Sequence, residues 1–270
     1  MATLSRVPLI AGNWKMNLDH LQAIAFVQKL AWTLREARHD YRAVEVAVFP
    51  PFTDLRSVQN LVGSDGLDVA YGAQDVSEHE SGAFTGEISA SFLQALHCRY
   101  VIIGHSERRM FHAESDEQIG RKLAALLRHS LIPILCVGET ASDLAEHGAS
   151  AIPVAQLTAA VRGAALTPEQ VGLSGLVVAY EPVWAIGSGQ AATPGQAEEV
   201  AARLRETLAA LLGDHVAESA RILYGGSVKS GNIASFMRER NIDGALVGGA
   251  SLEVAEFASI ARFLQHVGTV

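Results

Sequence analysis

The sequence predicts a single (β/α)8 barrel, and two observations support this prediction. Eight short apolar runs, rich in Val, Ile and Leu, recur along the chain, and their lack of polar alternation is typical of strands buried on both faces of a parallel sheet. Longer segments with apolar residues at helical spacing lie between these runs. Eight strands and eight helices in strict alternation favour one closed barrel over an open sheet.

The predicted strands are spread over the whole chain. They cover residues 7–11, 44–49, 67–71, 100–103, 132–137, 176–180, 221–224 and 245–247. Among the intervening helices, residues 197–212 carry a clear pattern, because Val200, Leu204 and Leu208 recur at helical spacing. Proline and glycine fall at the loops and mark no central linker, so residues 1–270 are expected to form one domain.

The composition restricts the partners of the chain. Its 270 residues are 49% hydrophobic and carry a formal net charge of −8. This charge argues against non-specific nucleic-acid binding, which needs a basic face. It also repels anionic substrates, so an anionic substrate must be held by a local positive site.

Nothing in the sequence directs the chain to a membrane. No run reaches the roughly 18 apolar residues of a membrane span, and residues 1–7 lack the apolar stretch of a signal peptide. Cys98 and Cys136 lie in apolar surroundings without metal-type spacing, which indicates buried thiols in a reducing compartment. A cytoplasmic protein without a membrane partner is expected.

Five predicted strands run into polar or glycine-rich segments, which a barrel would bring to one rim. These segments are residues 12–17, 104–109, 181–189, 225–227 and 248–251. Glu181 stands between an apolar run and a glycine-hinged apolar loop, which suggests a general base under a movable lid. The alternative is a solvated glutamate at the rim, since charged residues are mostly exposed. The predicted lid comprises Pro182, Val183, Trp184, Ala185, Ile186, Gly187, Ser188 and Gly189.

The segments 225–227 and 248–251 indicate a phosphate site. Glycines let backbone N–H groups approach an anion, and each segment precedes a predicted helix whose N-terminus favours negative charge. Loops after strands seven and eight commonly hold phosphate in this fold, although tight packing of a turn explains an isolated Gly-Gly pair about as often. Lys15 can add a full positive charge; its alternative role is that of a solvated lysine at a strand end.

His105 precedes Ser106 and Glu107, where a short helix is expected to begin. A helix N-terminus disfavours imidazolium, so the ring would stay neutral and donate an N–H to a substrate oxygen. The alternative is a histidine satisfied by backbone partners.

Motifs of other chemistries are missing from the sequence. It contains no Walker-type phosphate loop and no zinc-type cluster of Cys and His, and no nucleophile elbow occurs in a strand-turn-helix setting. Residues 187–192 fit a relaxed dinucleotide pattern, but they lie several residues beyond their strand. No metal and no cofactor is therefore expected.

Together these segments closely resemble the triosephosphate isomerase family over nearly the whole chain. The resemblance is carried by the His105 run and by Asn13-Trp14-Lys15-Met16-Asn17, Gly72-Ala73-Gln74-Asp75, Ala179-Tyr180-Glu181-Pro182-Val183-Trp184-Ala185-Ile186-Gly187, Tyr224-Gly225-Gly226-Ser227-Val228 and Leu246-Val247-Gly248-Gly249-Ala250. Several such segments in the right order are highly specific. The resemblance implies interconversion of dihydroxyacetone phosphate and D-glyceraldehyde 3-phosphate through an enediolate, in glycolysis and gluconeogenesis.

The resemblance also assigns roles to individual residues. Glu181 would move a proton between neighbouring carbons, while neutral His105 would polarise the carbonyl. Lys15 and Asn13 would stabilise the oxyanion, and Glu107 would help to order the charges around them. The phosphate would lie against the backbone N–H groups of Gly187, Ser227, Gly248 and Gly249.

The lid departs from the usual family pattern in two places. In the family, the hydroxyls of Tyr224 and Ser227 help to hold the closed lid, and both residues are present. Ser188 stands where the family usually has Thr, and residues 190–192 replace a common Lys-Thr-Ala hinge. These changes bear on the opening rate of the lid and not on the chemistry.

Gln74 and residues 82–87, which include Thr85, resemble the long third loop of the family. The tip of that loop enters a neighbouring subunit near Asn13 and Lys15, so the resemblance implies a homodimer. The alternative is a long mobile loop on a monomer.

Two other functions stay open from the residues alone. Another sugar-phosphate barrel enzyme would share the phosphate loops but not the set formed by Asn13, Lys15, His105 and Glu181. A non-catalytic phosphate-binding barrel would be expected to have lost Glu181 or Lys15. The intact set disfavours both alternatives.

Overall fold

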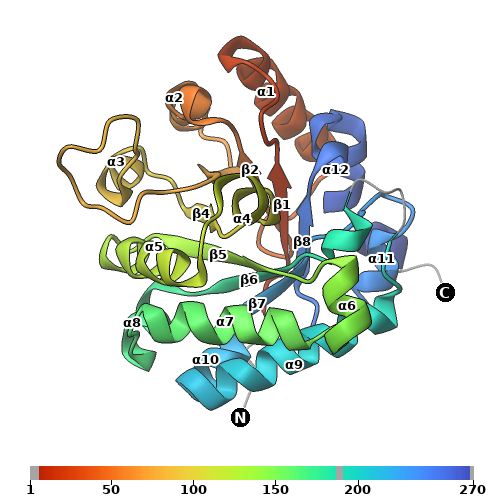
Figure 1. Cartoon of the computed structure of the whole chain (residues 1–270). Coiled ribbons are helices and arrows are strands. Elements are labelled where there is room, and N and C mark those ends of the chain that lie inside the picture. Colours follow the sequence, from red (N-terminus) through yellow and green to blue (C-terminus); the bar gives the residue numbers. More distant parts are fainter. Residues whose placement is uncertain (1–5, 187–190, 268–270) are drawn as a thin grey trace.

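In the computed structural model, which describes residues 6–186 and 191–267, eight parallel strands close into a barrel. The strands are β1 (Leu9–Asn13), β2 (Glu45–Phe49), β3 (Ala70–Ala73), β4 (Tyr100–Ile103), β5 (Ile132–Val137), β6 (Val177–Tyr180), β7 (Arg221–Tyr224) and β8 (Gly244–Val247). Each strand pairs with the next, and β8 returns to β1, so that Leu9 lies between Glu45 and Gly244 (Figure 1). The predicted barrel is confirmed.

The strand boundaries were predicted closely for β4, β5 and β7 and less well for β1 and β3. The run 67–71 was expected to be the third strand, but its pairing with β2 begins only at Ala70, opposite Ala47. Leu67 and Asp68 form the approach to the barrel and have no ladder partner there. The first strand extends to Asn13, so this side chain belongs to the strand itself and not to the loop beyond it.

Helices surround the barrel (Figure 1). They are α1 (His20–Glu36), α2 (Leu55–Asp65), α3 (Ala90–Ala95), α4 (Ser106–His112), α5 (Asp116–Arg128), α6 (Ala141–His147), α7 (Ala151–Gly163), α8 (Pro168–Ser174), α9 (Pro194–Leu212), α10 (Asp214–Ser219), α11 (Ile233–Phe236), α12 (Val254–Ala261) and α13 (Leu264–Val267), with the 3-10 turns η1 (Phe52–Asp54), η2 (Val183–Ala185) and η3 (Gly249–Leu252). Several connections hold more than one helix, as α6, α7 and α8 do between β5 and β6. The expected alternation of strands and helices is confirmed, since each connection between successive strands holds at least one helix, but the described chain has more helices than the expected eight.

The helix predicted over 197–212 is α9, and it starts three residues earlier than its apolar pattern. Thr193 caps it, because its side chain accepts a hydrogen bond from the Gln196 N–H while the Gln196 side chain reaches back to the cap. Pro194 occupies the first turn, where its missing N–H costs nothing. The residues that fix the start of this helix, Thr193 and Pro194, thus precede the apolar residues that predict its body.

Two apolar layers explain why the strands lack polar alternation. One face of each strand fills the barrel interior, with Leu9, Ala11, Ala47, Phe49, Tyr100, Ile102, Ile134, Cys136, Val177, Ala179, Leu223 and Leu246. The other face, with residues such as Ile10 and Val46, packs against the surrounding helices. Both faces are buried, so both select apolar side chains.

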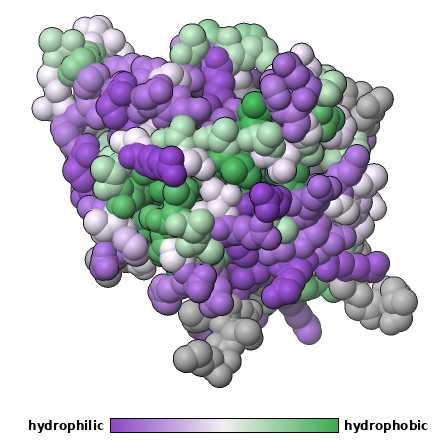
Figure 2. All heavy atoms as spheres, turned by 60° about the horizontal axis from the view of Figure 1, so that its bottom comes forward, coloured by the Kyte–Doolittle hydropathy of each residue, from purple (hydrophilic) through white to green (hydrophobic). Residues whose placement is uncertain are grey.

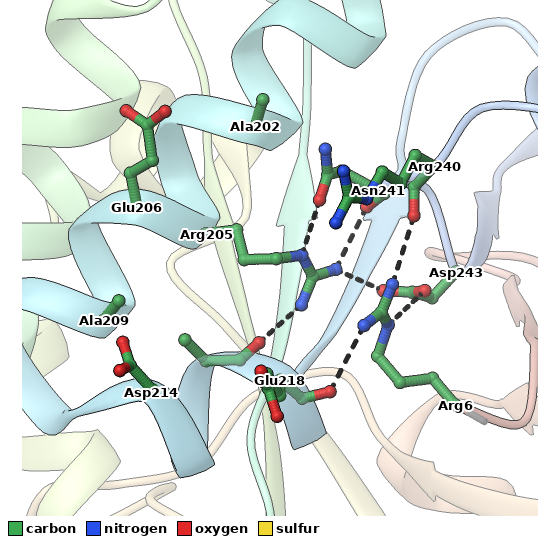
Figure 3. A pocket seen from close by; sticks show the side chains of 11 residues that line it. Arg6, Ala202, Arg205, Glu206, Ala209, Asp214, Glu218, Arg240, Asn241 and Asp243 are labelled. Atoms are coloured by element: carbon green, nitrogen blue, oxygen red, sulfur yellow. Dashed lines mark hydrogen bonds and ion pairs between the residues drawn. The ribbon is translucent and has the colours of Figure 1, made fainter. Parts of the chain in front are cut away.

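A partly buried ion cluster lies beside the amino ends of β1 and β8, at the opposite end of the barrel from the strand exits. Figure 3 shows Arg6 and Arg205 pointing toward Asp243, which precedes β8. The carboxylate oxygens of Asp243 lie 2.6 Å from Arg6 Nε and 2.7 Å from Arg205 Nη2. The remaining guanidinium N–H groups of Arg6 and Arg205 donate mainly to backbone carbonyls, among them that of Glu218. The hollow here is about 630 Å³. Every guanidinium nitrogen of Arg6 and of Arg205 already donates to a protein acceptor, so these two side chains serve structure. In Figure 2, which brings the bottom of Figure 1 forward, hydrophilic side chains cover much of the surface.

Replacing Asp243 by alanine is expected to lower the free energy of unfolding by roughly 1–3 kcal/mol, because two partly buried guanidinium groups lose the carboxylate that they share. Urea denaturation followed by circular dichroism measures this change. Glu206→Ala is the control, since Glu206 pairs with Arg203 on the exposed surface of α9 and its loss should cost at most about 0.5 kcal/mol. Equal effects of the two substitutions would contradict a structural role for the cluster.

No helix in the described part of the chain is long and apolar enough to cross a membrane.

Candidate active site

The strand exits converge on one cavity of about 290 Å³ at the carboxyl rim of the barrel. Of the residues predicted from the sequence, its lining includes Asn13, Lys15, His105, Glu181, Ile186, Ser227, Gly248 and Gly249. Glu107 reaches the site through its contact with Lys15. Gly187, Ser188 and Gly189 lie outside the described residues. The structure therefore brings together side chains that the sequence separates by more than 200 positions.

Lys15 is held in an unfavourable backbone conformation by its neighbours. Its φ is 53°, in the left-handed region that residues other than glycine rarely adopt. The Asn13 side chain accepts a hydrogen bond from the Lys15 N–H at 3.0 Å. Gln74 Nε2 donates to the carbonyls of both Lys15 and Phe49 at 2.8 Å. Strain of this kind persists only where the surroundings impose it. The hydrogen bonds of Lys15 with Asn13 and Gln74 therefore fix its backbone position.

This geometry gives Gln74 a function that the sequence did not indicate. Gln74 was predicted as part of a loop that reaches a neighbouring subunit. In the described structure it lies directly after β3 and secures the Lys15 backbone of its own chain. Gln74 therefore positions a site residue within one subunit.

The charge of Lys15 is already paired. Its Nζ lies 2.5 Å from Glu107 Oε1, on the first turn of α4. The Lys15 stem runs along the eighth strand exit, because a Cβ built on Gly248 would lie 3.7 Å from Lys15 Cε. The ammonium group thus sits between the first, fourth and eighth strand exits.

His105 caps α4 and is only 6% exposed. Its Nδ1 accepts the Glu107 N–H at 3.2 Å, so this nitrogen carries no proton and the neutral ring has its proton on Nε2. Nε2 lies 2.9 Å from Glu181 Oε1. Burial lowers the pKa of His105, but the carboxylates of Glu181 and Glu107 together raise this pKa overall. Lys15 opposes this upward shift.

Glu181 follows β6 directly and is 2% exposed. The alternative of a solvated rim glutamate is therefore wrong. Its second carboxylate oxygen accepts the Ser106 N–H at 2.9 Å, from the N-terminus of α4. Burial alone raises the pKa of Glu181, but His105, the Ser106 N–H and Lys15 lower it overall. The group is thus an ionised carboxylate at neutral pH, ready to accept a proton.

Two glycines allow the Glu181 backbone to pass close to its neighbours. A Cβ at Gly138 would lie 1.8 Å from the Glu181 carbonyl oxygen, and one at Gly225 would lie 3.0 Å from Glu181 Cγ. Real Cβ contacts do not occur at the first distance, so Gly138 is required where the exits of β5 and β6 meet. Nothing in the local sequence around Gly138 indicates this requirement.

The seventh and eighth strand exits line the cavity and carry unpaired backbone N–H groups. Among the described residues, those of Gly226 and Ser227 have no hydrogen-bond acceptor. Gly249 begins the turn η3, whose first N–H groups have no partner within the turn. Unpaired N–H groups on two adjacent loops favour an anion at this end of the cavity.

The described part of the predicted lid, residues 182–186, is held at its first turn by Glu139. This buried carboxylate accepts hydrogen bonds from Trp184 Nε1 at 2.8 Å and from the Tyr180 hydroxyl at 2.9 Å. Burial raises the pKa of Glu139 overall, although these two hydrogen bonds favour the charged form and lower it. Glu139 was missed in the sequence, although it follows the fifth strand and lies at a strand exit like the other site residues.

Of the two predicted latch residues, Tyr224 contacts the described chain just after the predicted lid, and Ser227 lines the cavity. The Tyr224 hydroxyl is buried and accepts the Ala192 N–H at 3.1 Å. Ala192 is the second described residue after the gap at 187–190. Ser227 is half-buried and lines the cavity. In the described part of the chain, no group of three or more side chains is arranged to hold a metal ion.

Comparison with known proteins agrees with this geometry. A family model described as triosephosphate isomerase matches residues 8–264. The triosephosphate isomerase of Leifsonia xyli subsp. xyli is 69% identical over 264 residues, which cover 98% of this chain and 100% of the relative. That of Streptomyces avermitilis is 56% identical over 96% of this chain and 98% of the relative. That of Mycobacterium tuberculosis strain H37Rv is 51% identical over 96% of this chain and 97% of the relative.

Proposed function

The chain belongs to the triosephosphate isomerase family, and we propose that it interconverts dihydroxyacetone phosphate and D-glyceraldehyde 3-phosphate at the rim cavity. The observation that carries this proposal is the placement of Glu181, His105 and Lys15 around one small cavity beside two phosphate-type loops. A general base, a neutral hydrogen-bond donor and a cation are what proton transfer next to a carbonyl requires.

Glu181 is the base in this proposal. Its carboxylate takes a proton from the carbon beside the carbonyl, which leaves an enediolate, and then returns a proton to the neighbouring carbon. In the free enzyme the base contacts His105 Nε2, so a substrate must enter between these side chains and replace that contact. The lowered pKa of Glu181 keeps the carboxylate ionised before the substrate arrives.

His105 and Lys15 stabilise the oxygens of the enediolate. The Nε2–H of His105 donates to the carbonyl oxygen and transfers a proton between the two oxygens. Lys15 and Asn13 stabilise the developing negative charge, and Glu107 holds the Lys15 ammonium in place at 2.5 Å. One preorganised donor of this kind contributes on the order of 10²–10³ in rate.

The phosphate occupies the end of the cavity formed by Ser227, Gly248 and Gly249, together with Gly187 from the lid. The unpaired N–H groups there, and the Lys15 stem beside Gly248, support this placement. A substrate anchored by its phosphate presents its carbonyl end to Glu181 and His105. Binding energy at the non-reacting end thereby orients the reacting carbons.

The lid has a chemical purpose in this scheme. An enediolate beside a phosphate ester can expel the phosphate, so closure over the intermediate excludes water and restricts that side reaction. Residues 182–189 form the lid, and the hydroxyls of Tyr224 and Ser227 hold it closed. Ser188 and residues 190–192 depart from the family pattern, and they affect the rate of opening and not the proton transfers.

The reaction places the enzyme in glycolysis and gluconeogenesis, and we assign it to the cytoplasm as one domain over residues 1–270. No observation favours a non-catalytic phosphate-binding barrel or another sugar-phosphate enzyme, since the base, the donor and the cation are all present.

The experiment that tests this function is isomerisation of dihydroxyacetone phosphate in deuterium oxide, followed by proton NMR. The Glu181 carboxyl exchanges its proton with solvent, so deuterium should enter the product at the carbon beside the carbonyl. Conversion without any deuterium would mean that the transferred hydrogen does not exchange with solvent, and no conversion would contradict the proposed substrate.

We also propose a homodimer formed around the loop after β3. Asp75 anchors this loop through Lys122 Nζ at 2.7 Å, and the Ser77 N–H closes it on the Ile88 carbonyl at 2.8 Å. Large apolar side chains stay exposed on this loop and on neighbouring rim segments, namely Met16, Phe84, Phe92, Met110 and Phe111. Apolar surface of this kind is typical of a face that another protein covers.

Thr85→Arg is expected to weaken dimerisation and activity together, because the exposed tip of the loop would carry a charge into the interface. Sedimentation velocity and the turnover rate at equal protein concentration measure the two effects. Ala210→Arg, at an exposed position of α9, is the control and should change neither. A fully active monomeric Thr85→Arg variant would contradict the proposal.

A further inference from the structure

The phosphate end of the cavity needs positive charge that the proposed machinery does not fully supply. The chain has a net charge of −8, so its overall field repels a phosphate dianion. Lys15 lines the cavity, but Glu107 neutralises it at 2.5 Å. Glu181 adds a further negative charge to the same cavity. Backbone N–H groups carry only partial charges, so an unpaired cation at this end would change the local field most.

Lys229 is the cation that meets this need. It lines the cavity, two positions after Ser227, and its side chain is exposed. Its backbone N–H donates to Asn232 Oδ1 at 2.8 Å, which fixes the loop just before α11. Within the described residues, its ammonium group has no ion pair and no hydrogen bond.

Comparison with the other lysines shows that an unpaired ammonium group beside the cavity is found only at Lys229 among the described residues. The sequence contains four lysines. Lys15 pairs with Glu107, and Lys122 pairs with Asp75 and Glu114. Lys29 is exposed on α1, likewise without an ion pair to any described residue, but it does not line the cavity. Lys29 and Lys229 therefore match in exposure and pairing and differ in their distance from the site.

We propose that Lys229 is the phosphate-steering residue of the cavity, where its unpaired charge attracts and helps to hold the phosphate dianion of a three-carbon monophosphate ester. This inference rests on the proposed function for the identity of the substrate. Lys229 acts on the entry and retention of the anion, while the proton transfers belong to Glu181 and His105. Its effect is electrostatic and operates over about 10 Å at 0.1 M salt.

Lys229→Gln is expected to lower kcat/KM for D-glyceraldehyde 3-phosphate by about three- to tenfold at low ionic strength, since steering of a charged substrate is worth at least this much. The loss should appear mainly in KM, with kcat nearly unchanged. It should shrink as salt is added, because the lost interaction is screened. Lys229→Arg should restore most of the activity, because it restores the charge.

The matched control is Lys29→Gln, which removes the same charge from the overall field and should leave kcat/KM within about twofold. Unphosphorylated D-glyceraldehyde is a second control, since Lys229→Gln should not change its slow turnover. A substitution that merely disturbed the loop would affect both substrates and both kinetic constants.

Binding of inorganic phosphate, measured by isothermal titration calorimetry, separates this inference from the proposed function. Weaker phosphate binding by Lys229→Gln than by Lys29→Gln supports a steering role even if the wild type turns over no triose phosphate. Equal phosphate binding and equal salt dependence in the two variants would overturn the role of Lys229, whatever the activity of the wild type.

Discussion

Glu181→Gln is expected to reduce turnover of D-glyceraldehyde 3-phosphate by at least about 10³-fold, which corresponds to about 4 kcal/mol of activation barrier. Glutamine keeps the size of the side chain and can still contact the Ser106 N–H, but it cannot accept a proton from carbon. The loss should therefore appear in kcat, while KM changes little. A coupled assay of the purified variant measures both constants.

Two controls separate the loss of the base from a loss of structure. The urea midpoint of Glu181→Gln should stay close to that of the wild type, because glutamine fills the same space and its amide oxygen can still accept the Ser106 N–H. Glu206→Gln removes an exposed carboxylate on α9 and should leave turnover unchanged. Activity of Glu181→Gln within tenfold of the wild type would show that another group takes the proton.

The second large effect is expected for His105→Gln, which should lower kcat by about 10²–10³-fold. This loss is expected because the tautomer of the ring is fixed. Nδ1 accepts the Glu107 N–H, and Nε2–H points at Glu181. An amide can donate a hydrogen bond from a similar place, but it cannot pass a proton between two oxygens. The reduction should therefore be smaller than that of Glu181→Gln.

His215→Gln is the matched control, because His215 is exposed on α10. Steady-state kinetics of both variants at pH 7 give the comparison. If His105→Gln raised KM and left kcat unchanged, the ring would contribute to substrate binding alone, and its proposed role in the proton transfers would be wrong.

The barrel was predictable because its signal is local. Buried parallel strands read as continuous apolar runs, and three of these runs coincide with β4, β5 and β7. The beginnings and ends of elements were less predictable, since pairing decides them. Ala70 begins β3 because Ala47 lies opposite, and no residue near position 67 carries that information.

The site was predictable in part for the same reason. Glu181, His105 and Lys15 stand at strand exits, and a barrel gathers strand exits on one rim. Glu139 stands at such an exit too and was missed, because its role depends on Trp184 and Tyr180, about 40 positions away. The sequence signal for Glu139 is its position at a strand exit, two residues after β5.

Other features depend wholly on contacts between distant segments. Gly138 is required by the backbone of Glu181, and Gln74 holds the carbonyl of Lys15 across 59 positions. The pairing of His105 with Glu181 in the free enzyme is likewise a product of the closed barrel. Such contacts arise from packing, and no periodicity in the sequence encodes them.

The most direct test of the central claim is the turnover of D-glyceraldehyde 3-phosphate by the wild-type protein in a coupled assay that detects dihydroxyacetone phosphate. Rapid conversion without added metal or cofactor is the predicted result, and it would establish the rim cavity as the site of an aldose–ketose isomerase. No conversion, while inorganic phosphate still binds, would contradict the account and assign the cavity to a different phosphate ester.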